Sequence, residues 1–258
     1  MSRPPVDDPW QTLRRFTPAR IALGRSGASL PTAEILRFGL AHAQARDAVH
    51  LALDVAALDA VLRPRHGESV VVHSLAPDRA TYLLRPDLGR RLDEASADRL
   101  ARTAAARRDG WDLAFVIADG LSALAVQHHA PALLDVLVPR LPADCTVAPP
   151  VIAVQGRVAL GDEIGELLGA RLVAILIGER PGLSSPDSLG VYLTWAPKRG
   201  RHDAERNCVS NVRPEGLGYD AGAMKLAWLM KEARHLQLTG VGLKDRSDLL
   251  DVPDAGGQ

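Results

Sequence analysis

The spacing of hydrophobic residues changes along the chain, from helical in the N-terminal part to strand-rich after Pro64. From Thr32 to Ala48, apolar residues recur every three or four positions. This spacing predicts a helix, with Thr32 as its N-cap and Pro31 as the barrier to an earlier start. A second helix is predicted over Val55 to Leu62. Together these segments indicate a helical N-terminal part.

After Pro64, short β-branched runs alternate with amphipathic segments, a pattern typical of a mainly parallel α/β sheet. The predicted strands are Val70 to His73, Leu113 to Ala118, Val151 to Val154, Leu172 to Ile177 and Gly190 to Trp195. The predicted helices are Gly89 to Arg107, Ala130 to Leu141, Asp162 to Leu168 and Asp220 to Leu238. In the last helix the apolar residues form one stripe, and the charged residues lie largely off it.

The two patterns divide the chain into an N-terminal arm and helical region over residues 1–64 and an α/β domain over residues 65–251. Residues 1 to about 18 are rich in proline, mixed in charge and without a sustained period. They are expected to form an arm with little order that lies on a partner or in solvent. The tail at residues 252–258 is predicted to be disordered.

Composition and charge argue against nucleic-acid binding. The chain has 31 basic and 31 acidic residues, so it has no overall positive field to attract a polyanion. Only 4% of its 258 residues are aromatic, too few for the stacking platforms that hold single strands.

Neither a membrane span nor a metal site is indicated. The longest apolar runs, such as Leu172 to Ile177, are far shorter than the roughly 20 residues that cross a bilayer. The N-terminus lacks the basic and apolar stretches of a secretory signal. The two cysteines, Cys145 and Cys208, have no CxxC or Cys/His spacing, which fits a reducing compartment and argues against zinc. The protein is therefore expected inside the cell.

Ligands of parallel sheets bind beyond the carboxyl ends of the strands, so the loops there are the first candidates for a site. The segment Asp119 to Ser122 follows one predicted strand. It has no GxSxG pattern, and the spacing places no histidine or acid beside Ser122, so a serine nucleophile is disfavoured. We interpret the segment as a turn, with Ser122 as a cap for the residues after it.

The second loop, Gly178 to Leu183, follows the most apolar predicted strand. Its glycines would let the backbone approach a flat ligand, and Pro181 restricts the backbone before binding. A plain Pro-Gly turn is an equally good interpretation. The loop lacks GxxxxGK[ST], which excludes a Walker phosphate loop.

The third loop, Arg206 to Asn211, is predicted between the last strand and the C-terminal helix. It is rich in hydrogen-bonding groups suited to a neutral ligand that carries amides. The simpler interpretation, favoured by the spacing alone, makes Cys208 a small buried hydrophobe and lets the asparagines bond local backbone.

Histidine and arginine complete the candidates. The adjacent pair His128 and His129 is a poor metal site, because neighbouring side chains on regular structure point apart. The chain has no D-x-H-x-x-G string, by which many corrinoid proteins supply a histidine to cobalt. Arg90 and Arg91 are expected either to pair with carboxylates of a partner or to form a solvated first turn of a helix.

Six strings, in order along nearly the whole chain, resemble the small subunit (light chain) of ethanolamine ammonia-lyase. They are RFTPARIALGRSGASLPT (Arg15 to Thr32), YLLRPDLGRRLD (Tyr82 to Asp93), VIADGLS (Val116 to Ser122), GRVALGDEIGELLGA (Gly156 to Ala170), IGERPGL (Ile177 to Leu183) and RNCVSNV (Arg206 to Val212). Because the strings are collinear, chance similarity is a poor explanation.

The resemblance implies a helical N-terminal part, a Rossmann-like α/β cobalamin-binding domain and a large, barrel-forming catalytic partner in a hetero-oligomer. Adenosylcobalamin would lie between the two subunits. The family's cobalamin contacts correspond here to Val158, Glu179 and Cys208. No catalytic residue and no metal ligand is assigned to this chain, since the substrate contacts of the family belong to the large subunit. The nucleotide base of the cofactor would stay on cobalt.

The implied reaction is the radical conversion of ethanolamine to acetaldehyde and ammonia by a carbon–nitrogen lyase, active only as a complex. The alternative is a non-catalytic binding or scaffolding subunit that has lost cobalamin. The missing GxGxxG disfavours a nucleotide-binding oxidoreductase. The expected location is the cytoplasm. Some relatives carry a longer leader for a bacterial microcompartment, which leaves encapsulation open here.

Overall fold

The computed structural model describes residues 9–17 and 19–247, so the predicted disordered tail lies outside the described residues. Seven α-helices lie in these residues: α1 (Thr32–His50), α2 (Val55–His66), α3 (Arg79–Leu84), α4 (Glu94–Ala105), α5 (Ala123–Leu137), α6 (Leu160–Leu168) and α7 (Tyr219–Leu236). They also contain six strands: β1 (Val70–His73), β2 (Trp111–Ala118), β3 (Val151–Val154), β4 (Ala170–Gly178), β5 (Leu189–Trp195) and β6 (Arg206–Val212).

The six strands form one sheet in the order β1-β3-β2-β4-β5-β6. The first four strands of this order are parallel, and β5 and β6 are added antiparallel at one side. The carboxyl ends of β1, β2, β3 and β4 therefore lie at one edge of the sheet, as does the beginning of β5 and the end of β6. This arrangement confirms the predicted α/β class with a mainly parallel sheet.

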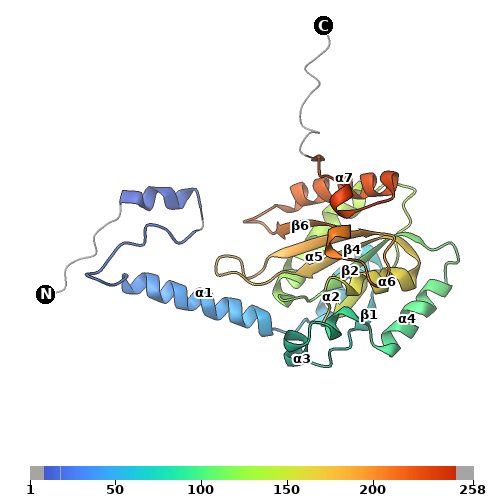
Figure 1. The fold of residues 1–258 in the computed structure, drawn as a ribbon, viewed down its shortest axis with the longest axis horizontal. Coiled ribbons are helices and arrows are strands. Elements are labelled where there is room, and N and C mark those ends of the chain that lie inside the picture. Colours follow the sequence, from blue (N-terminus) through green and yellow to red (C-terminus); the bar gives the residue numbers. More distant parts are fainter. Residues whose placement is uncertain (1–8, 18, 248–258) are drawn as a thin grey trace, which may run out of the picture.

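Helices cover both faces of the sheet and create two cores (Figure 1). On one face, Leu113, Leu176 and Val191 pack with buried residues of α2, α5 and α7. On the other face, Val116, Val173 and Ile175 pack with α4 and α6. Strands buried on both faces are expected to be continuous apolar runs, which is why β2 and β4 could be predicted from sequence.

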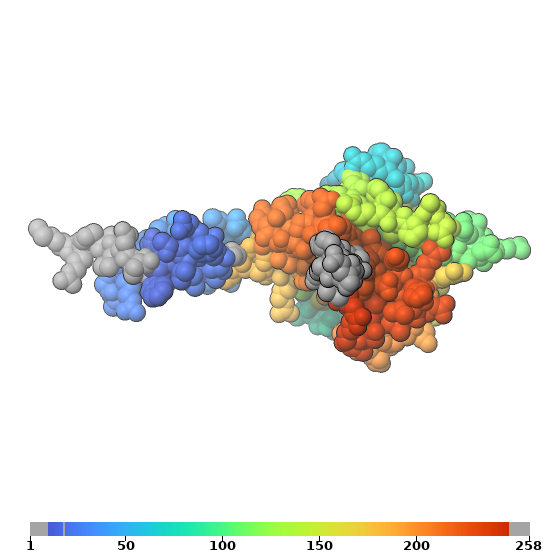
Figure 2. Space-filling view, turned by 90° about the horizontal axis from the view of Figure 1, so that it is seen from above, coloured from blue at the N-terminus to red at the C-terminus, as the bar shows by residue number. Residues whose placement is uncertain are grey.

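The helix α1 extends away from the sheet (Figure 1), and with the segment before it forms an arm beside the body (Figure 2). Ala48 is its one buried residue. The segment before α1 contains a 3-10 helix, Pro9–Arg15, so this part of the arm is more regular than predicted. Thr32 is the first helical residue and Pro31 precedes it without a side-chain cap, so the prediction of Thr32 as the N-cap is wrong.

Two helix predictions need correction. The segment Gly89 to Arg107 is not one helix, because a 3-10 helix at Leu88–Arg90 is followed by extended backbone, and Asp93 then caps α4. The helix predicted from Ala130 begins seven residues earlier, at Ala123. Since its early residues are buried against the sheet, tertiary packing stabilises that first part.

The segment Arg206 to Asn211, predicted to be a loop, forms most of β6. Its polar residues obscured the strand, because β6 lies at the edge of the sheet and buries only Arg206, Val209 and Val212. The short helix α3 was not predicted. No helix among residues 9–17 and 19–247 is both long and apolar enough to cross a membrane.

Candidate functional site

The carboxyl ends of β2 and β3 are joined by Asp119. Its side chain is 2% exposed, and its two oxygens accept hydrogen bonds from the backbone N–H groups of Gln155 and Gly156 at 3.0 Å each. Burial raises the pKa of Asp119, while these hydrogen bonds and the nearby guanidinium of Arg79 act in the opposite direction. The carboxylate therefore fixes the turn after β3 in place.

The helix α3 reinforces the same edge of the sheet. Arg79 donates to the carbonyl oxygens of Val49 at 2.7 Å and Gly120 at 2.8 Å. The hydroxyl of Tyr82 donates to the carbonyl oxygen of Gly156 at 2.9 Å. The guanidinium of Arg157 stacks over the Tyr82 ring, 4.2 Å from its centroid. Sequence reasoning missed this helix. Asp78, whose side chain caps it, is the signal that was available.

Ser122 is a structural cap, as predicted. Its Oγ accepts from the N–H of Ala125 at 3.3 Å and donates to the carbonyl of Pro186 at 2.9 Å. Among the described residues, no histidine or carboxylate hydrogen-bonds to Ser122. His129 instead bonds Asp187 and Tyr219, at 3.2 Å and 2.8 Å. The serine thus holds the β4–β5 loop on α5 and is not set up as a nucleophile.

Glu179 follows β4 directly and connects it to the residue before β5 and to β6. Its carboxylate accepts from the hydroxyl of Ser188, from that of Ser210 at 2.5 Å and from the backbone N–H of Asn211 at 3.2 Å. Gly190 leaves the room for it, since a Cβ there would lie 2.9 Å from a Glu179 oxygen. The tip of this loop is a tight turn closed by two backbone hydrogen bonds between Gly182 and Ser185.

Cys208 pairs with Tyr192 across β5 and β6, on the sheet face where Glu179 lies over Gly190. The residue is exposed, so the interpretation of Cys208 as a buried hydrophobe is wrong. Although the residue as a whole is exposed, partial desolvation of its sulfur and the charge of Glu179 raise the pKa of Cys208, while a hydrogen bond with Tyr192 lowers it. Its thiol is therefore neutral at pH 7.

Asn207 also departs from the simple interpretation, because it bonds distant backbone. Its side chain accepts from the N–H of Gly240 at 2.8 Å and donates to the carbonyl of Leu243 at 2.9 Å.

Val158 lies in the turn between β3 and α6 and is half-buried. It borders a hollow of about 290 Å³, whose other lining residues include Arg157, Arg201 and Arg206. Because Arg206 lies two residues before Cys208, the hollow adjoins the open face of β6. The structure thus brings Glu179 and Cys208 together and places Val158 at the neighbouring hollow.

The open face lies beside α6, which packs mainly over β4 and β2 and reaches β6 through the ion pair of Asp162 with Arg206. Cys208 and Ser210 are exposed. The string RNCVSNV does not alternate between polar and apolar residues, so it carries no signal of an edge strand with one solvated face.

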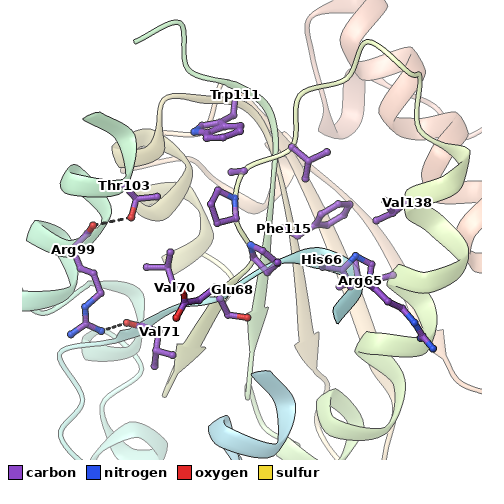
Figure 3. Close-up of a pocket in the computed structure, with 17 residues that line it drawn as sticks. Arg65, His66, Glu68, Val70, Val71, Arg99, Thr103, Trp111, Phe115 and Val138 are labelled. Atoms are coloured by element: carbon purple, nitrogen blue, oxygen red, sulfur yellow. Dashed lines mark hydrogen bonds between the residues drawn. The ribbon is translucent and has the colours of Figure 1, made fainter. Parts of the chain in front are cut away.

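A hollow of about 900 Å³ lies elsewhere (Figure 3). Trp111, Val70 and Pro150 line it, and each lies at or just before the amino end of a strand. None of Val158, Glu179 and Cys208 borders it. This hollow therefore lies at the edge of the sheet opposite Glu179.

Within the described part of the chain, no group of three or more His, Cys, Asp and Glu side chains is placed to hold a metal ion.

The arm exposes an apolar surface of its own. Trp10, Phe16, Leu36 and Leu40 are each more than 60% exposed. Exposed apolar surface on this scale is typical of protein contacts.

Comparison with known proteins gives one consistent result. Residues 7–244 match the family model described as ethanolamine ammonia-lyase light chain. The ethanolamine ammonia-lyase small subunit of Azotobacter vinelandii is 60% identical over 98% of this chain and 94% of its own length. The small subunits of Pseudomonas fluorescens and Xanthomonas campestris pv. campestris are 57% and 59% identical, over 100% and 96% of this chain and 95% and 92% of their own lengths.

Proposed function

The chain belongs to the ethanolamine ammonia-lyase light chain family, and from this premise we propose that it binds adenosylcobalamin together with a large subunit. The assembled enzyme would convert ethanolamine to acetaldehyde and ammonia. This chain would hold and orient the cofactor, while the large subunit would contact the substrate. When bound, adenosylcobalamin supplies the organic radical through homolysis of its cobalt–carbon bond.

The open face around Glu179 is the observation that carries the proposal. A corrin ring is flat and bears amide side chains, so it suits a face with few projecting groups and several hydrogen-bonding ones. Glu179, Tyr192 and Ser210 supply such groups, and Gly190 keeps the surface low. A carboxylate has about four acceptor positions, of which Glu179 uses three internally, so one is left for an amide N–H of the ligand.

The other two predicted contacts would play simpler roles. Val158 would offer apolar surface or backbone at the border of the ring, and Cys208 would fill space close to it. A neutral thiol is a poor metal ligand, because cobalt and other metals bind the thiolate. Since the chain has no D-x-H-x-x-G string either, the nucleotide base of the cofactor would remain on cobalt.

The arm would contact the large subunit. Its apolar residues gain little burial within this chain, because Ala48 is the one buried residue of α1. The β4–β5 loop extends from the body on the same side as α1 (Figure 1). One partner lying against that side would meet both the arm and the open face.

The test is reconstitution with the large subunit. The large chain, alone and co-expressed with this chain, is incubated with adenosylcobalamin, passed through gel filtration and examined for cobalamin absorption and acetaldehyde formation. We expect retained cofactor and activity only in the complex. Full activity of the large chain alone would refute the proposal, and a complex that forms without retaining cobalamin would favour the scaffolding alternative. A cytoplasmic or microcompartment location stays a prediction.

A further inference from the structure

A series of polar contacts leads from the buried His129 to the carboxylate of Glu179. His129 lies on α5 and is 5% exposed, and its Nε2 lies 3.2 Å from one oxygen of Asp187 in the β4–β5 loop. A guanidinium nitrogen of Arg213, which follows β6, lies 3.5 Å from the other oxygen of Asp187. Three segments that are far apart in the sequence therefore meet at one carboxylate.

Arg213 continues this series of contacts toward Glu179. Its Nε donates to the side-chain oxygen of Asn211 at 2.9 Å, and the backbone N–H of Asn211 donates to Glu179 at 3.2 Å. Asn211 has a φ of +57°, in the left-handed region that residues other than glycine rarely adopt. The N–H that faces Glu179 therefore belongs to a residue in an uncommon backbone conformation, and Arg213 holds the side chain of that residue.

The other end of the series is anchored to two helices. A carboxylate only accepts hydrogen bonds, so the Nε2 of His129 carries the proton toward Asp187, and Nδ1 accepts from the hydroxyl of Tyr219 at 2.8 Å. Burial raises the pKa of Tyr219, as does the charge of Asp187, so the phenol keeps its proton and can donate it. Asp187 is thus tied to α5 directly and to the first residue of α7 through His129.

A buried arginine is an expensive way to hold a loop. Arg213 is 8% exposed, and a buried charge lowers stability unless it is both paired and hydrogen-bonded. Val212 beside it is fully buried and already packs the end of β6 into the core. What the guanidinium adds is direction, because its planar group joins Asp187 of the loop to Asn211 of the strand in a fixed geometry.

We propose that Arg213 is a positioning residue for the cofactor face, an inference that rests on the proposed function. Through Asn211 and Asp187 it sets the direction of the Glu179 carboxylate before the cofactor binds. The acceptor position of Glu179 that is not used within the chain then faces the ligand. A group that is ordered in advance loses less conformational freedom on binding, which strengthens the affinity.

The test is a double-mutant cycle on cyanocobalamin binding to the complex of this chain with its large subunit. Dissociation constants are measured by absorption titration for the wild type, Arg213→Gln, Glu179→Ala and the double variant. Arg213→Gln should weaken binding about tenfold, the equivalent of about one charge-assisted hydrogen bond, but less than about twofold further in the Glu179→Ala background. Arg234→Gln is the matched control, because it removes an ion pair with Asp144 near the other end of α7 and should leave the affinity within about twofold.

Hydrogen exchange at the Asn211 amide, measured in the cofactor-free complex, tests the same role without a ligand. Arg213→Gln should accelerate this exchange about tenfold or more. Unchanged exchange, unchanged cyanocobalamin affinity of Arg213→Gln, or independent losses in the two single variants would each overturn the positioning role. If Arg213→Gln prevents assembly, the same cycle is run with Asp187→Asn, and independent losses there would overturn the role as well. If the wild-type complex binds no cyanocobalamin, the proposed function itself fails, while the exchange measurement still decides whether Arg213 fixes Asn211.

Discussion

Replacing Glu179 with alanine removes the carboxylate that joins the β4–β5 loop to β6. The hydroxyls of Ser188 and Ser210 can turn to water after the change, but the N–H of Asn211 loses its acceptor. Hydrogen bonds to a charged group contribute about 1.5–3 kcal/mol each when buried. Since Glu179 is only half-buried, we expect a total loss of about 2 kcal/mol, which lowers Tm by about 4–8 °C for a domain of this size.

The assay measures thermal unfolding of the cofactor-free complex, with hydrogen exchange at the Asn211 amide as a local probe. Glu215→Ala is the matched control, because Glu215 is exposed and should change stability by less than about 0.5 kcal/mol. Cyanocobalamin affinity is measured in parallel. Unchanged Tm and unchanged exchange would refute the structural reasoning, whereas lower stability with unchanged cobalamin affinity would show that Glu179 supports the strand without contacting the cofactor.

Three further predictions rest on single contacts. Gly120→Ala should destabilise the fold by more than about 2 kcal/mol in denaturant unfolding, because φ is +56° and a Cβ would lie 2.3 Å from a β4 carbonyl oxygen; unchanged stability would contradict this. Bound cobalamin should slow maleimide labelling of Cys208 and not of Cys145, and equal rates with and without cofactor would remove Cys208 from the site. The hydrogen bond from Arg63 holds the pKa of Asp59 below its usual 3.8. The stability that the Asp59 carboxylate contributes to the fold is therefore present above pH 3.8 and is lost as the pH falls through the lowered pKa. In Asp59→Asn, the free energy of unfolding should fall less steeply with acid than in the wild type, and parallel curves of stability against pH for the two proteins would contradict this.

The edge strand β6 contributes both to the open face and to the hollow beside Val158. Cys208 and Ser210 belong to the open face beside Glu179, and Arg206 reaches the hollow. The buried pair of Arg206 with Asp162 holds the strand to α6. A single seven-residue strand therefore lines both surfaces.

Sequence alone determined the parallel part of the sheet. The bounds of β1 and β3 agree with prediction to the residue, and β2 and β4 differ only at their ends. The inner strands β2, β3 and β4 are mostly buried on both faces and are therefore continuous apolar runs that local pattern reveals, and the half-buried edge strand β1 still has three consecutive valines. Collinear strings also sufficed to indicate the family and, through it, Val158, Glu179 and Cys208.

Tertiary structure alone decided which of these residues meet and what surrounds them. The strand β6 was invisible to local pattern because its polar residues are paired along an edge and its register depends on β5. The partners of Glu179 lie 9, 31 and 32 residues away, and the hollow beside Val158 joins three separate segments. Hydrophobic periodicity reports only whether each position is buried, while contacts between distant polar groups depend on how the chain returns to the same edge of the sheet.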